Sequence, residues 1–249
     1  MSEEKNVAFL RSPEKISRLY ACPLFAGMQE EEVRYTLSLL AGEERQYSRG
    51  AFLHHAGEPL HRFGLVLSGC VGVYADDLDG NQVQMASVGP GETFGESLCY
   101  LRLAHAPVYI LAVEDSDLLW LHTDAFRTIG ETGDARIFPI YHRFVSMLAG
   151  RTLAMNDRIQ ILSKIRLRDK LLTFFAQYAR HNGRDTFTIP FDRAGLALYL
   201  GTDRAALSRE LSAMQKEGLI EFYRNSFRIL RGSSTLCCKC NKTKEESGV

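Results

Sequence analysis

The stretch FDRAGLALYLGTDRAALSREL, residues 191–211, carries the strongest structural signal in this chain. Asp192 is a residue type that caps helix N-termini, and it precedes a predicted helix over residues 193–200. Gly201 then supplies the left-handed backbone conformation that a tight turn needs. A Thr-Asp pair follows at once as a second cap, so the pattern predicts another helix over about residues 204–217.

The second predicted helix has one apolar and one polar side. Leu207, Leu211 and Met214 recur at helical spacing and are expected to face the core. The turn and the solvent side then present the candidate DNA-contacting residues of this segment, Thr202, Arg204, Ala205, Ser208 and Arg209. A helix, a tight glycine turn and a second helix with outward Arg and Ser form the helix-turn-helix pattern, whose second helix enters the DNA major groove.

Residues 219–230, LIEFYRNSFRIL, predict two short strands joined by an Arg-Asn turn. Such a hairpin beside a helix-turn-helix is a wing that can touch phosphate, and Arg224 is its candidate contact. An amphipathic helix over about residues 164–180 and a strand over 186–191 precede the motif. We therefore predict a winged helix-turn-helix domain over residues 163–231. A helix hairpin by itself also occurs as plain structural packing in helical domains.

Charge is divided unevenly along the 249 residues, although the formal net charge is +0. Residues 1–163 hold 14 Lys and Arg against 21 Asp and Glu, a net charge of −7. Residues 164–249 hold 16 against 9, a net charge of +7. The basic part also carries the helix-turn-helix pattern, so it is the part expected to meet a polyanion. Chance scatter of charge over two solvated surfaces is the alternative interpretation.

Several function classes are disfavoured by what the sequence lacks. No apolar run approaches the roughly 18 residues that cross a bilayer, and the N-terminus lacks the basic start and long apolar stretch of a signal peptide. The chain contains no GxxxxGK[ST] phosphate loop, HExxH metal motif or G-x-S-x-G nucleophile elbow. We therefore predict a cytoplasmic protein that is not an enzyme, with no catalytic residues and no membrane partner.

The segment from about Gln46 to Leu121 alternates short apolar runs with turn signals. Runs such as GLVLSG, CVGVYA and VYILAV are separated by turns at gaps of 7 to 12 residues. That rhythm predicts an antiparallel sandwich or barrel, and short helices are expected over residues 13–44 before it. We assign residues 13–133 to this first domain. The sequence shows no βαβ rhythm, which argues against a Rossmann-type fold.

A long helix is predicted over residues 134–162. One apolar stripe at spacings of three and four runs along it, formed by Tyr141, Phe144, Leu148, Arg151, Met155, Ile159 and Leu162. A rod of this length with one apolar seam predicts a dimerisation helix that pairs with its symmetry mate. The alternative is a helix packed along its own barrel. The predicted fold class is α+β, with an N-terminal antiparallel β-roll, the dimerisation helix and the C-terminal winged helix-turn-helix.

Two segments give the chain its resemblance to a known family. Residues 91–96, GETFGE, and residues 199–211, YLGTDRAALSREL, resemble motifs of the cyclic-AMP receptor protein/FNR (Crp/Fnr) superfamily of bacterial transcription regulators. The resemblance covers roughly residues 20–231. It implies a homodimer with a cyclic-nucleotide-binding-like jelly roll at the N-terminus, a palindromic site in double-stranded DNA and, for an activator, contact with RNA polymerase.

The function that this resemblance implies is transcription regulation under allosteric control by a small-molecule effector. Two recognition helices on a twofold axis can read half-sites about one DNA turn apart. The alternative is a nucleotide- or anion-sensing regulatory module that acts through protein–protein contacts.

The same resemblance assigns roles on the second helix of the motif. Arg209 matches the family's guanine-reading arginine, which suits a bidentate contact to O6 and N7. Ser208 resembles the serine before this arginine in FNR-like members, and Arg204 lies where relatives contact base or phosphate. Ala205 stands where relatives usually carry glutamate, so an acceptor for cytosine is missing and the usual half-site is not expected.

The resemblance also points to an effector site in the β-roll, but not to cyclic AMP. Cyclic-AMP-binding relatives place an Arg-Ser pair ten residues after a glutamate, whereas Glu96 is followed at that distance by Ala106-Pro107. Loss of the arginine removes the main charge-assisted partner of the cyclic phosphate, so cyclic AMP is not the expected ligand. The candidate effector residues are Glu96, Cys99, Tyr100, Arg102, His105, Arg151 and Thr152.

Arg151 is the residue on which binding of a small anionic effector would depend. A cation in an apolar seam is costly to bury unless it is paired. We hypothesise that Arg151, with Arg102 or His105, receives an anion at the barrel–helix junction. An ion pair, for instance with Glu96, is the equal alternative.

The sequence favours no resident metal or redox cofactor. Only Cys22 precedes residue 70, so the N-terminal cysteine group of an FNR-type iron–sulfur cluster is missing, and the seven histidines show no haem-ligand spacing. Cys237, Cys238 and Cys240 lie in a polar tail over residues 232–249, which is predicted to be disordered. Three thiols are one fewer than the four ligands of a closed zinc site.

Overall fold

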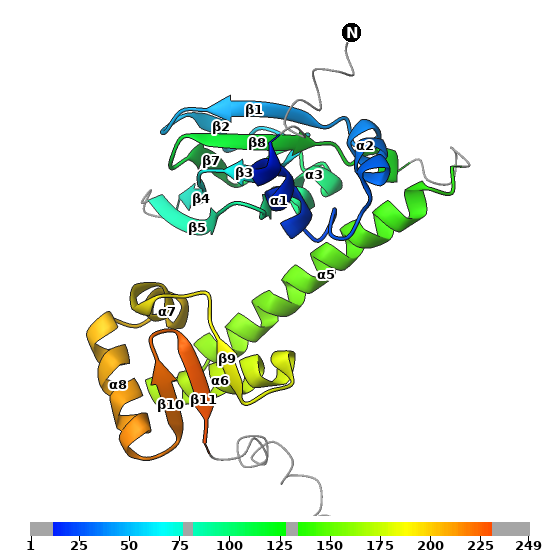
Figure 1. Cartoon of the computed structure of the whole chain (residues 1–249). Coiled ribbons are helices and arrows are strands. Elements are labelled where there is room, and N and C mark those ends of the chain that lie inside the picture. Colours follow the sequence, from blue (N-terminus) through cyan, green and yellow to red (C-terminus); the bar gives the residue numbers. More distant parts are fainter. Residues whose placement is uncertain (1–11, 77–81, 128–133, 231–249) are drawn as a thin grey trace, which may run out of the picture. The chain divides into compact units, whose positions relative to one another are not determined.

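The computed structural model describes residues 12–76, 82–127 and 134–230. The chain divides into two compact units, Met1–Gly150 and Arg151–Val249. Helix α5 (Ile137–Leu162) begins in the first unit and ends in the second, as Figure 1 shows. The elements of each unit follow from local sequence signals.

The first unit is built around two four-stranded antiparallel sheets, with strand orders β1-β8-β3-β6 and β2-β7-β4-β5. Their strands are β1 (Glu43–Tyr47), β2 (Phe52–His54), β3 (Phe63–Ser68), β4 (Val71–Asp76), β5 (Gln82–Val88), β6 (Thr93–Phe94), β7 (Tyr109–Ala112) and β8 (Ser116–Leu121). Their facing sides enclose a core that includes Val71, Ile110 and Trp120. The predicted antiparallel β-roll is confirmed.

Short helices and the first part of α5 build a second core against this β-roll. They are α1 (Pro13–Ala21), α2 (Glu30–Leu39), α3 (Glu96–Leu101) and the short 3₁₀ helix η2 (Asp124–Phe126). Helix α2 begins with a capping box, in which the Gln29 N–H donates to the Glu32 carboxylate at 2.7 Å. The core joins side chains from several of these elements, among them Phe25, Phe63, Phe126 and Phe144. Figure 1 shows α2 and the first turns of α5 beyond one end of the strands.

Helix α5 corrects one detail of the predicted apolar seam. Phe144 is only 1% exposed, because it packs in the core of the first unit together with Ile140 and Met147. Val145, the next residue, is 42% exposed instead. The first half of the helix therefore packs on its own β-roll, which was the alternative, and the exposed row runs through Val145 rather than through Phe144.

The second unit is a small α+β domain. It contains α6 (Leu167–Asn182), β9 (Thr186–Thr188), α7 (Arg193–Leu200), α8 (Arg204–Lys216), β10 (Ile220–Tyr223) and β11 (Ser226–Ile229). The three strands form one antiparallel sheet in the order β10-β11-β9. Its core includes Ile161 at the end of α5, Phe175 on α6 and Phe227 on β11. The predicted winged helix-turn-helix is confirmed, and its first helix begins at Leu167 instead of residue 164.

Gly64 in β3 is required by close packing inside the β-roll. A Cβ built at Gly64 would lie 2.1 Å from the Phe94 ring, which is itself 2% exposed and packs edge-on against Trp120. The ring therefore occupies the space that any other residue at this position would need.

We predict that Gly64→Ala lowers the free energy of unfolding of the first unit by about 1–3 kcal/mol, because it overpacks this core. Trp120 is the single tryptophan of the chain, so urea unfolding followed by its fluorescence reports on this unit. Gly150→Ala is the control, since a Cβ added there meets nothing within 4 Å. An unchanged midpoint in Gly64→Ala would contradict the packing described here.

Candidate nucleic-acid interface and effector site

The turn between α7 and α8 is held by side-chain caps at both helix starts. Asp192 Oδ1 accepts a hydrogen bond from the Gly195 N–H at 2.7 Å, and Asp203 Oδ1 accepts one from the Ala206 N–H at 2.7 Å. Gly201 ends α7 with φ of +61°, the left-handed conformation that glycine adopts without strain. The backbone therefore forms the helix-turn-helix that these residue types predict.

Helix α8 presents the predicted contact residues to solvent. Its inward residues Leu207, Leu211 and Met214 are fully buried. The residues that face out are Arg204, Ala205, Ser208 and Arg209, all exposed, and Thr202 in the preceding turn is half-buried. The Ser208 hydroxyl donates to the Arg204 carbonyl at 2.9 Å, which leaves its oxygen lone pairs as acceptors. The structure thus brings together all five residues predicted on this segment.

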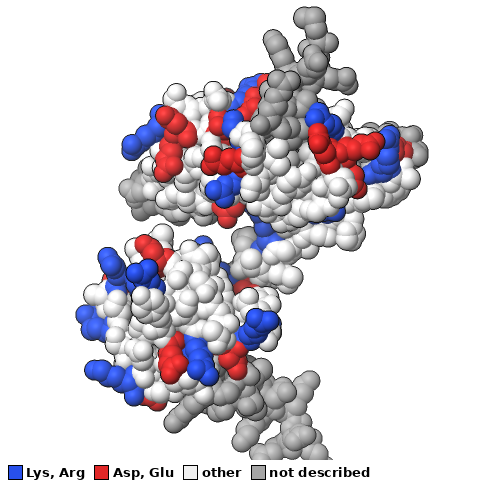
Figure 2. Space-filling view, in the orientation of Figure 1, with Lys and Arg blue, Asp and Glu red and all other residues white. Residues whose placement is uncertain are grey.

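Arg168 on α6 orients α8, and sequence reasoning did not single it out. Its guanidinium binds the Glu210 carboxylate at 2.6 Å and both oxygens of Glu217 at 2.7 and 2.8 Å. The two carboxylates raise the pKa of Arg168 above its ordinary value. These ion pairs balance the charges of Glu210 on α8 and of Glu217 at its C-cap. Figure 2 shows Lys and Arg side chains along the α8 side of the second unit. These ion pairs have no local signal in the sequence, because Arg168 is more than 40 residues away from both Glu210 and Glu217.

The wing is fixed to the rest of the domain at its tip and at its side. Asn225 Nδ2 donates to the Ile189 carbonyl at 3.1 Å, and the Ile189 N–H donates to the Asn225 carbonyl at 2.9 Å. The Arg193 guanidinium lies 4.9 Å from the ring centre of Phe222, and burial lowers the pKa of this guanidinium. The wing is therefore held at a defined position beside α7.

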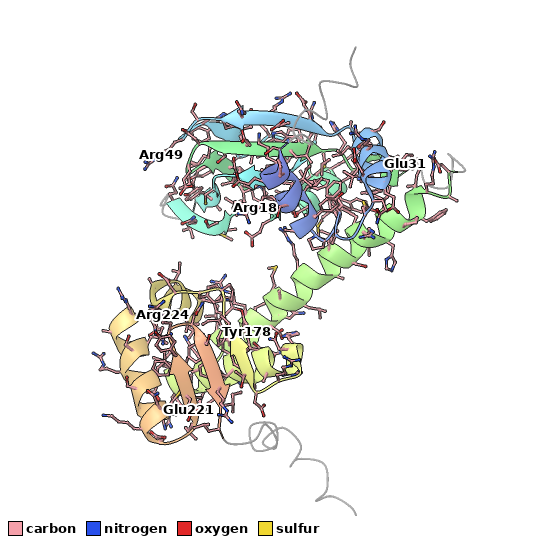
Figure 3. All side chains as sticks on the ribbon, viewed as in Figure 1. Arg18, Glu31, Arg49, Tyr178, Glu221 and Arg224 are labelled. Atoms are coloured by element: carbon pink, nitrogen blue, oxygen red, sulfur yellow. The ribbon has the colours of Figure 1, made fainter. Side chains whose placement is uncertain are left out.

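The wing tip carries Arg224, as predicted, and an aromatic residue that was not predicted. Arg224 has φ of +53°, a strained value for a residue with a side chain, and its guanidinium lies over the Tyr223 ring at 5.5 Å. Tyr223 is 74% exposed. Figure 3 labels Arg224 at the turn, with Glu221 farther along the hairpin. A tyrosine directly before a two-residue turn is the signal that could have pointed to Tyr223.

Two candidate effector residues lie in buried surroundings beside α5. Glu96 begins α3, is 3% exposed and accepts a hydrogen bond from the Thr93 hydroxyl. That hydroxyl is 3.8 Å from the Met147 sulfur on α5. Tyr100 packs against Phe144, with ring centres 5.7 Å apart. The start of α3 therefore contacts the first half of α5 within the first unit.

Two other candidates, Cys99 and Arg102, line a cavity of about 260 Å³ with His61, His122 and Asp124. The Cys99 thiol is buried, donates to the His61 carbonyl at 3.2 Å, and has its pKa raised by that burial. Arg102 binds Asp124 at 2.5 Å and holds the pKa of that carboxyl below its usual value. Arg102 is therefore directed toward Asp124.

The remaining effector candidates are His105, Arg151 and Thr152. His105 is exposed, and its Nδ1 lies 2.9 Å from the Gly57 carbonyl. Arg151 and Thr152 are exposed on the part of α5 that belongs to the second unit. Within the described ranges, no group of His, Cys, Asp or Glu is arranged to hold a metal ion. The tail cysteines Cys237, Cys238 and Cys240 lie outside the described residues.

Comparison with known proteins supports both units. A family model described as a cyclic nucleotide-binding domain matches residues 44–132, and one described as a Crp-like helix-turn-helix domain matches residues 165–232. The cyclic AMP receptor protein of Thermus thermophilus is 29% identical over 198 residues, which cover 80% of this chain and 88% of that protein. The chain belongs to the Crp/Fnr superfamily.

The solved structure of CprK shares the fold of this Crp/Fnr protein. CprK complexed with OCPA has a TM-score of 0.56 and 18% identity, with 83% of this chain and 92% of that chain covered. The crystal structure of the Thermus thermophilus catabolite activator protein is 28% identical, covers 86% of this chain and 96% of that chain, and has a TM-score of 0.47. The protein is a Crp-like transcription regulator with an effector-binding domain and a helix-turn-helix. No described helix is long and apolar enough to cross a membrane.

This Crp/Fnr chain has Ala106 where the resemblance places the arginine of cyclic-AMP-binding relatives, and this residue lies inside the β-roll. Ala106 is 1% exposed, and its backbone accepts a hydrogen bond from the Gly57 N–H and donates one to the Glu58 carbonyl. The position at which cyclic-AMP-binding relatives carry arginine therefore holds a small apolar side chain in the interior.

We predict that the Asp203 cap makes the stability of the second unit depend on pH. The Ala206 N–H and, less strongly, the charge of Arg209 hold the pKa of Asp203 below its usual value. A lowered folded-state pKa means that the stabilisation is complete above the unfolded-state pKa of about 3.9 and is lost as pH falls below it. Asp203→Asn keeps the capping oxygen without the charge, so the variant should lose less stability than the wild type between pH 6 and pH 3. Thermal unfolding followed by circular dichroism measures the difference, and parallel pH curves would contradict it.

Proposed function

We propose that the protein is a homodimeric, sequence-specific DNA-binding regulator whose α8 helices read the two halves of a palindromic site. The observation that supports this most directly is the outward row of Arg204, Ser208 and Arg209 on a helix whose opposite side is fully buried. A helix oriented in this way can insert its polar face into the major groove without exposing its own core. The exposed Arg224 at the wing tip supplies a phosphate contact.

Base reading in this proposal depends on two positions of α8. Arg209 donates two hydrogen bonds to O6 and N7 of a guanine, the contact that best distinguishes this base. Ala205 offers a methyl group where relatives usually carry a carboxylate acceptor, and a methyl group can pack on the C5-methyl of thymine. The preferred half-site therefore differs from that of glutamate-bearing relatives.

Dimerisation is proposed through a mainly apolar stripe on α5, in which Tyr141 and Leu148 are half-buried against the core of the first unit and the other members are exposed. The stripe repeats at alternating spacings of three and four. It differs from the predicted seam by Val145 in place of Phe144, by Thr152 in place of Arg151 and by the addition of Phe138. Its members are Phe138, Tyr141, Val145, Leu148, Thr152, Met155, Ile159 and Leu162. Phe138, Met155 and Ile159 are 56%, 66% and 60% exposed, which is unusual for large apolar residues on one helical face. A strict heptad of this kind is the pattern that pairs helices in a coiled coil.

Effector control is proposed through the β-roll, by a small molecule other than cyclic AMP. The Thr93 hydroxyl donates to Glu96 and lies 3.8 Å from the Met147 sulfur of α5, so a ligand at the start of α3 would act on the helix that continues into the DNA-binding unit. An effector that favours one arrangement of α5 would thereby shift the population of DNA-binding dimers. An anionic effector held by Arg151 is a variant of this proposal. Cytoplasmic location and contact with RNA polymerase remain expectations from the family.

We predict that Met155→Glu dissociates the dimer, because it places a charge in the middle of the apolar stripe. Leu153→Glu is the matched control, since Leu153 is equally exposed at 66% but lies on the opposite side of α5. Sedimentation equilibrium should give a mass near 56 kDa for wild type and Leu153→Glu, and about 28 kDa for Met155→Glu, from a chain mass of 28.0 kDa. A wild-type monomer, or a dimer that persists in Met155→Glu, would contradict the proposed interface.

We predict that Arg209→Ala costs about 1–3 kcal/mol of discrimination at one base pair of each half-site, because a bidentate contact is lost. Selection from random DNA identifies the site, and gel shifts at several salt concentrations measure the affinities for site and non-site DNA. Arg180→Ala, an exposed arginine on α6, is the control and should leave discrimination unchanged. Absence of any salt-dependent DNA binding by the wild type would refute the proposed function.

A further inference from the structure

The cavity of about 260 Å³ beside the end of α3 has no role in the proposed function. Strand β3 pairs with β8, and Phe63 lies opposite Leu121. His61 precedes β3 and His122 follows β8, so both histidines lie at the same end of this sheet. The cavity volume far exceeds the about 10–15 Å³ that one water molecule needs, and it is below the about 300–1,000 Å³ of pockets for drug-sized ligands. The cavity therefore suits a ligand of a few heavy atoms.

The side chains that line this cavity offer mainly hydrogen-bond donors. Within the described residues, neither the His61 nor the His122 imidazole has a hydrogen-bond partner. Each ring carries one N–H when it is neutral and two when it is protonated. One N–H group of the Arg102 guanidinium donates to Asp124 Oδ1 at 2.5 Å, which leaves its other N–H groups for a ligand. The Cys99 thiol instead donates within the protein, to the His61 carbonyl at 3.2 Å.

Arg102 has a backbone conformation that an arginine adopts only with strain. It is the C-cap of α3 and has φ of +50°, in the left-handed region. The C-caps of α6 and α7 have the same conformation, and both are glycines, Gly183 and Gly201. A glycine at the end of α3 would relieve the strain, but it would also remove the guanidinium that lines the cavity. Strain of this kind is concentrated at functional sites.

The ion pair between Arg102 and Asp124 is one that a ligand can replace. The two side chains are 53% and 62% exposed, and an exposed ion pair contributes little to stability because water screens it. An anion in the cavity would meet the same guanidinium and, in addition, the two imidazoles. Asp124 is therefore a competitor for Arg102 that the chain itself supplies.

The charges around the cavity favour an anion over a cation. The Arg102 hydrogen bond and, more weakly, the charge of Arg127 lower the pKa of Asp124. Burial and then the charge of Arg62 lower the pKa of His122, which the Glu43 carboxylate opposes. Three guanidinium groups thus act on the lining residues against two carboxylates, which leaves a positive charge before either imidazole is protonated.

We propose that this cavity binds a small oxyanion, a carboxylate or a phosphate, through the Arg102 guanidinium and the N–H groups of His61 and His122. The oxyanion displaces the Asp124 carboxylate from Arg102 and accepts hydrogen bonds from several donors at once, which guanidinium groups are suited to give. The site belongs to the first unit and does not depend on DNA binding, so its failure would leave the test of Arg209 unaffected.

The first experiment titrates the full-length protein, labelled with ¹⁵N-histidine, with sodium phosphate and with sodium acetate, and follows nuclear magnetic resonance. Sodium chloride at equal ionic strength is the reference. The signals of the two rings are assigned by their absence from His61→Gln and His122→Gln. We expect both signals to move to saturation with at least one oxyanion, and the tighter binder distinguishes a phosphate ligand from a carboxylate. Shifts no larger than those with sodium chloride would overturn the proposal.

The second experiment changes the two members of the ion pair, with opposite expected effects on oxyanion affinity. Arg102→Gln should weaken binding by about tenfold or more, because a charge-assisted contact is lost. Asp124→Asn should strengthen binding by about two- to fivefold, because it removes a competitor that is held only by an exposed ion pair. A gain in affinity cannot result from misfolding.

Arg34→Gln is the matched control for Arg102→Gln, because Arg34 is 52% exposed and forms a similar ion pair with Glu30 at 2.7 Å. It should leave oxyanion binding unchanged. Weaker binding by Asp124→Asn, or equal losses in Arg102→Gln and Arg34→Gln, would overturn the proposal.

The third experiment tests the two imidazoles through pH. A bound anion stabilises protonated imidazoles, so the affinity of the wild type should rise as pH falls from 8 to 6. The double variant His61→Gln and His122→Gln keeps two N–H donors without a titratable ring, so comparison with it cancels ionisation of the oxyanion itself. The groups Arg62, Arg102, Glu43 and Asp124 keep their charges over this range. The same pH dependence in both proteins would contradict the role of the histidines.

Discussion

The burial of one side of α8 is the interaction on which the DNA-facing surface depends. Leu207, Leu211 and Met214 are all 0% exposed, and burying each such side chain stabilises the fold by about 1.5–3 kcal/mol. No other rotation of α8 about its axis would bury three large apolar side chains. Arg204 and Arg209 face solvent as a consequence, and the ion pairs of Arg168 refine this orientation at a smaller energetic contribution because they are partly exposed.

Helix α5 connects this surface to the β-roll through side chains that belong to two different cores. Phe144 is buried in the first unit and Ile161 in the second, while Met155 between them is mostly exposed. The proposed allosteric control requires that a change in the packing of one end of this helix be passed to its other end. The exposed stripe between the anchors is available for pairing, so association and coupling between the units would use different faces of the same helix. This division supports the proposed allosteric control.

Most of the fold could be predicted because its signals are local. Asp192, Gly201 and Asp203 specify the ends of α7 and α8 by their own hydrogen bonds and backbone conformation, and the structure shows those bonds. The seam of α5 was less certain because Phe144 and Val145 both satisfy a spacing of three or four from Tyr141 and Leu148. Only the neighbouring β-roll decides that Phe144 is the buried one. The spacing of apolar residues along α5 is compatible with a stripe through Phe144 or through Val145.

The effector site was harder to predict because residues distant in the sequence determine the direction of its side chains. Arg102 and His105 have the right chemistry for an anion, but Asp124 and the Gly57 carbonyl, distant in sequence, determine where they point. Side chains whose direction depends on long-range packing cannot be assigned from residue type alone.

The residue at one interior position of the β-roll bears on whether the proposed effector is charged. Moving an anion from water into an apolar interior costs several kcal/mol unless a cation or several donors receive it. At the position where the resemblance places an arginine of cyclic-AMP-binding relatives, this chain has Ala106, which is 1% exposed. An alanine methyl group offers no charge to a cyclic phosphate. The proposal of an effector other than cyclic AMP rests on this difference.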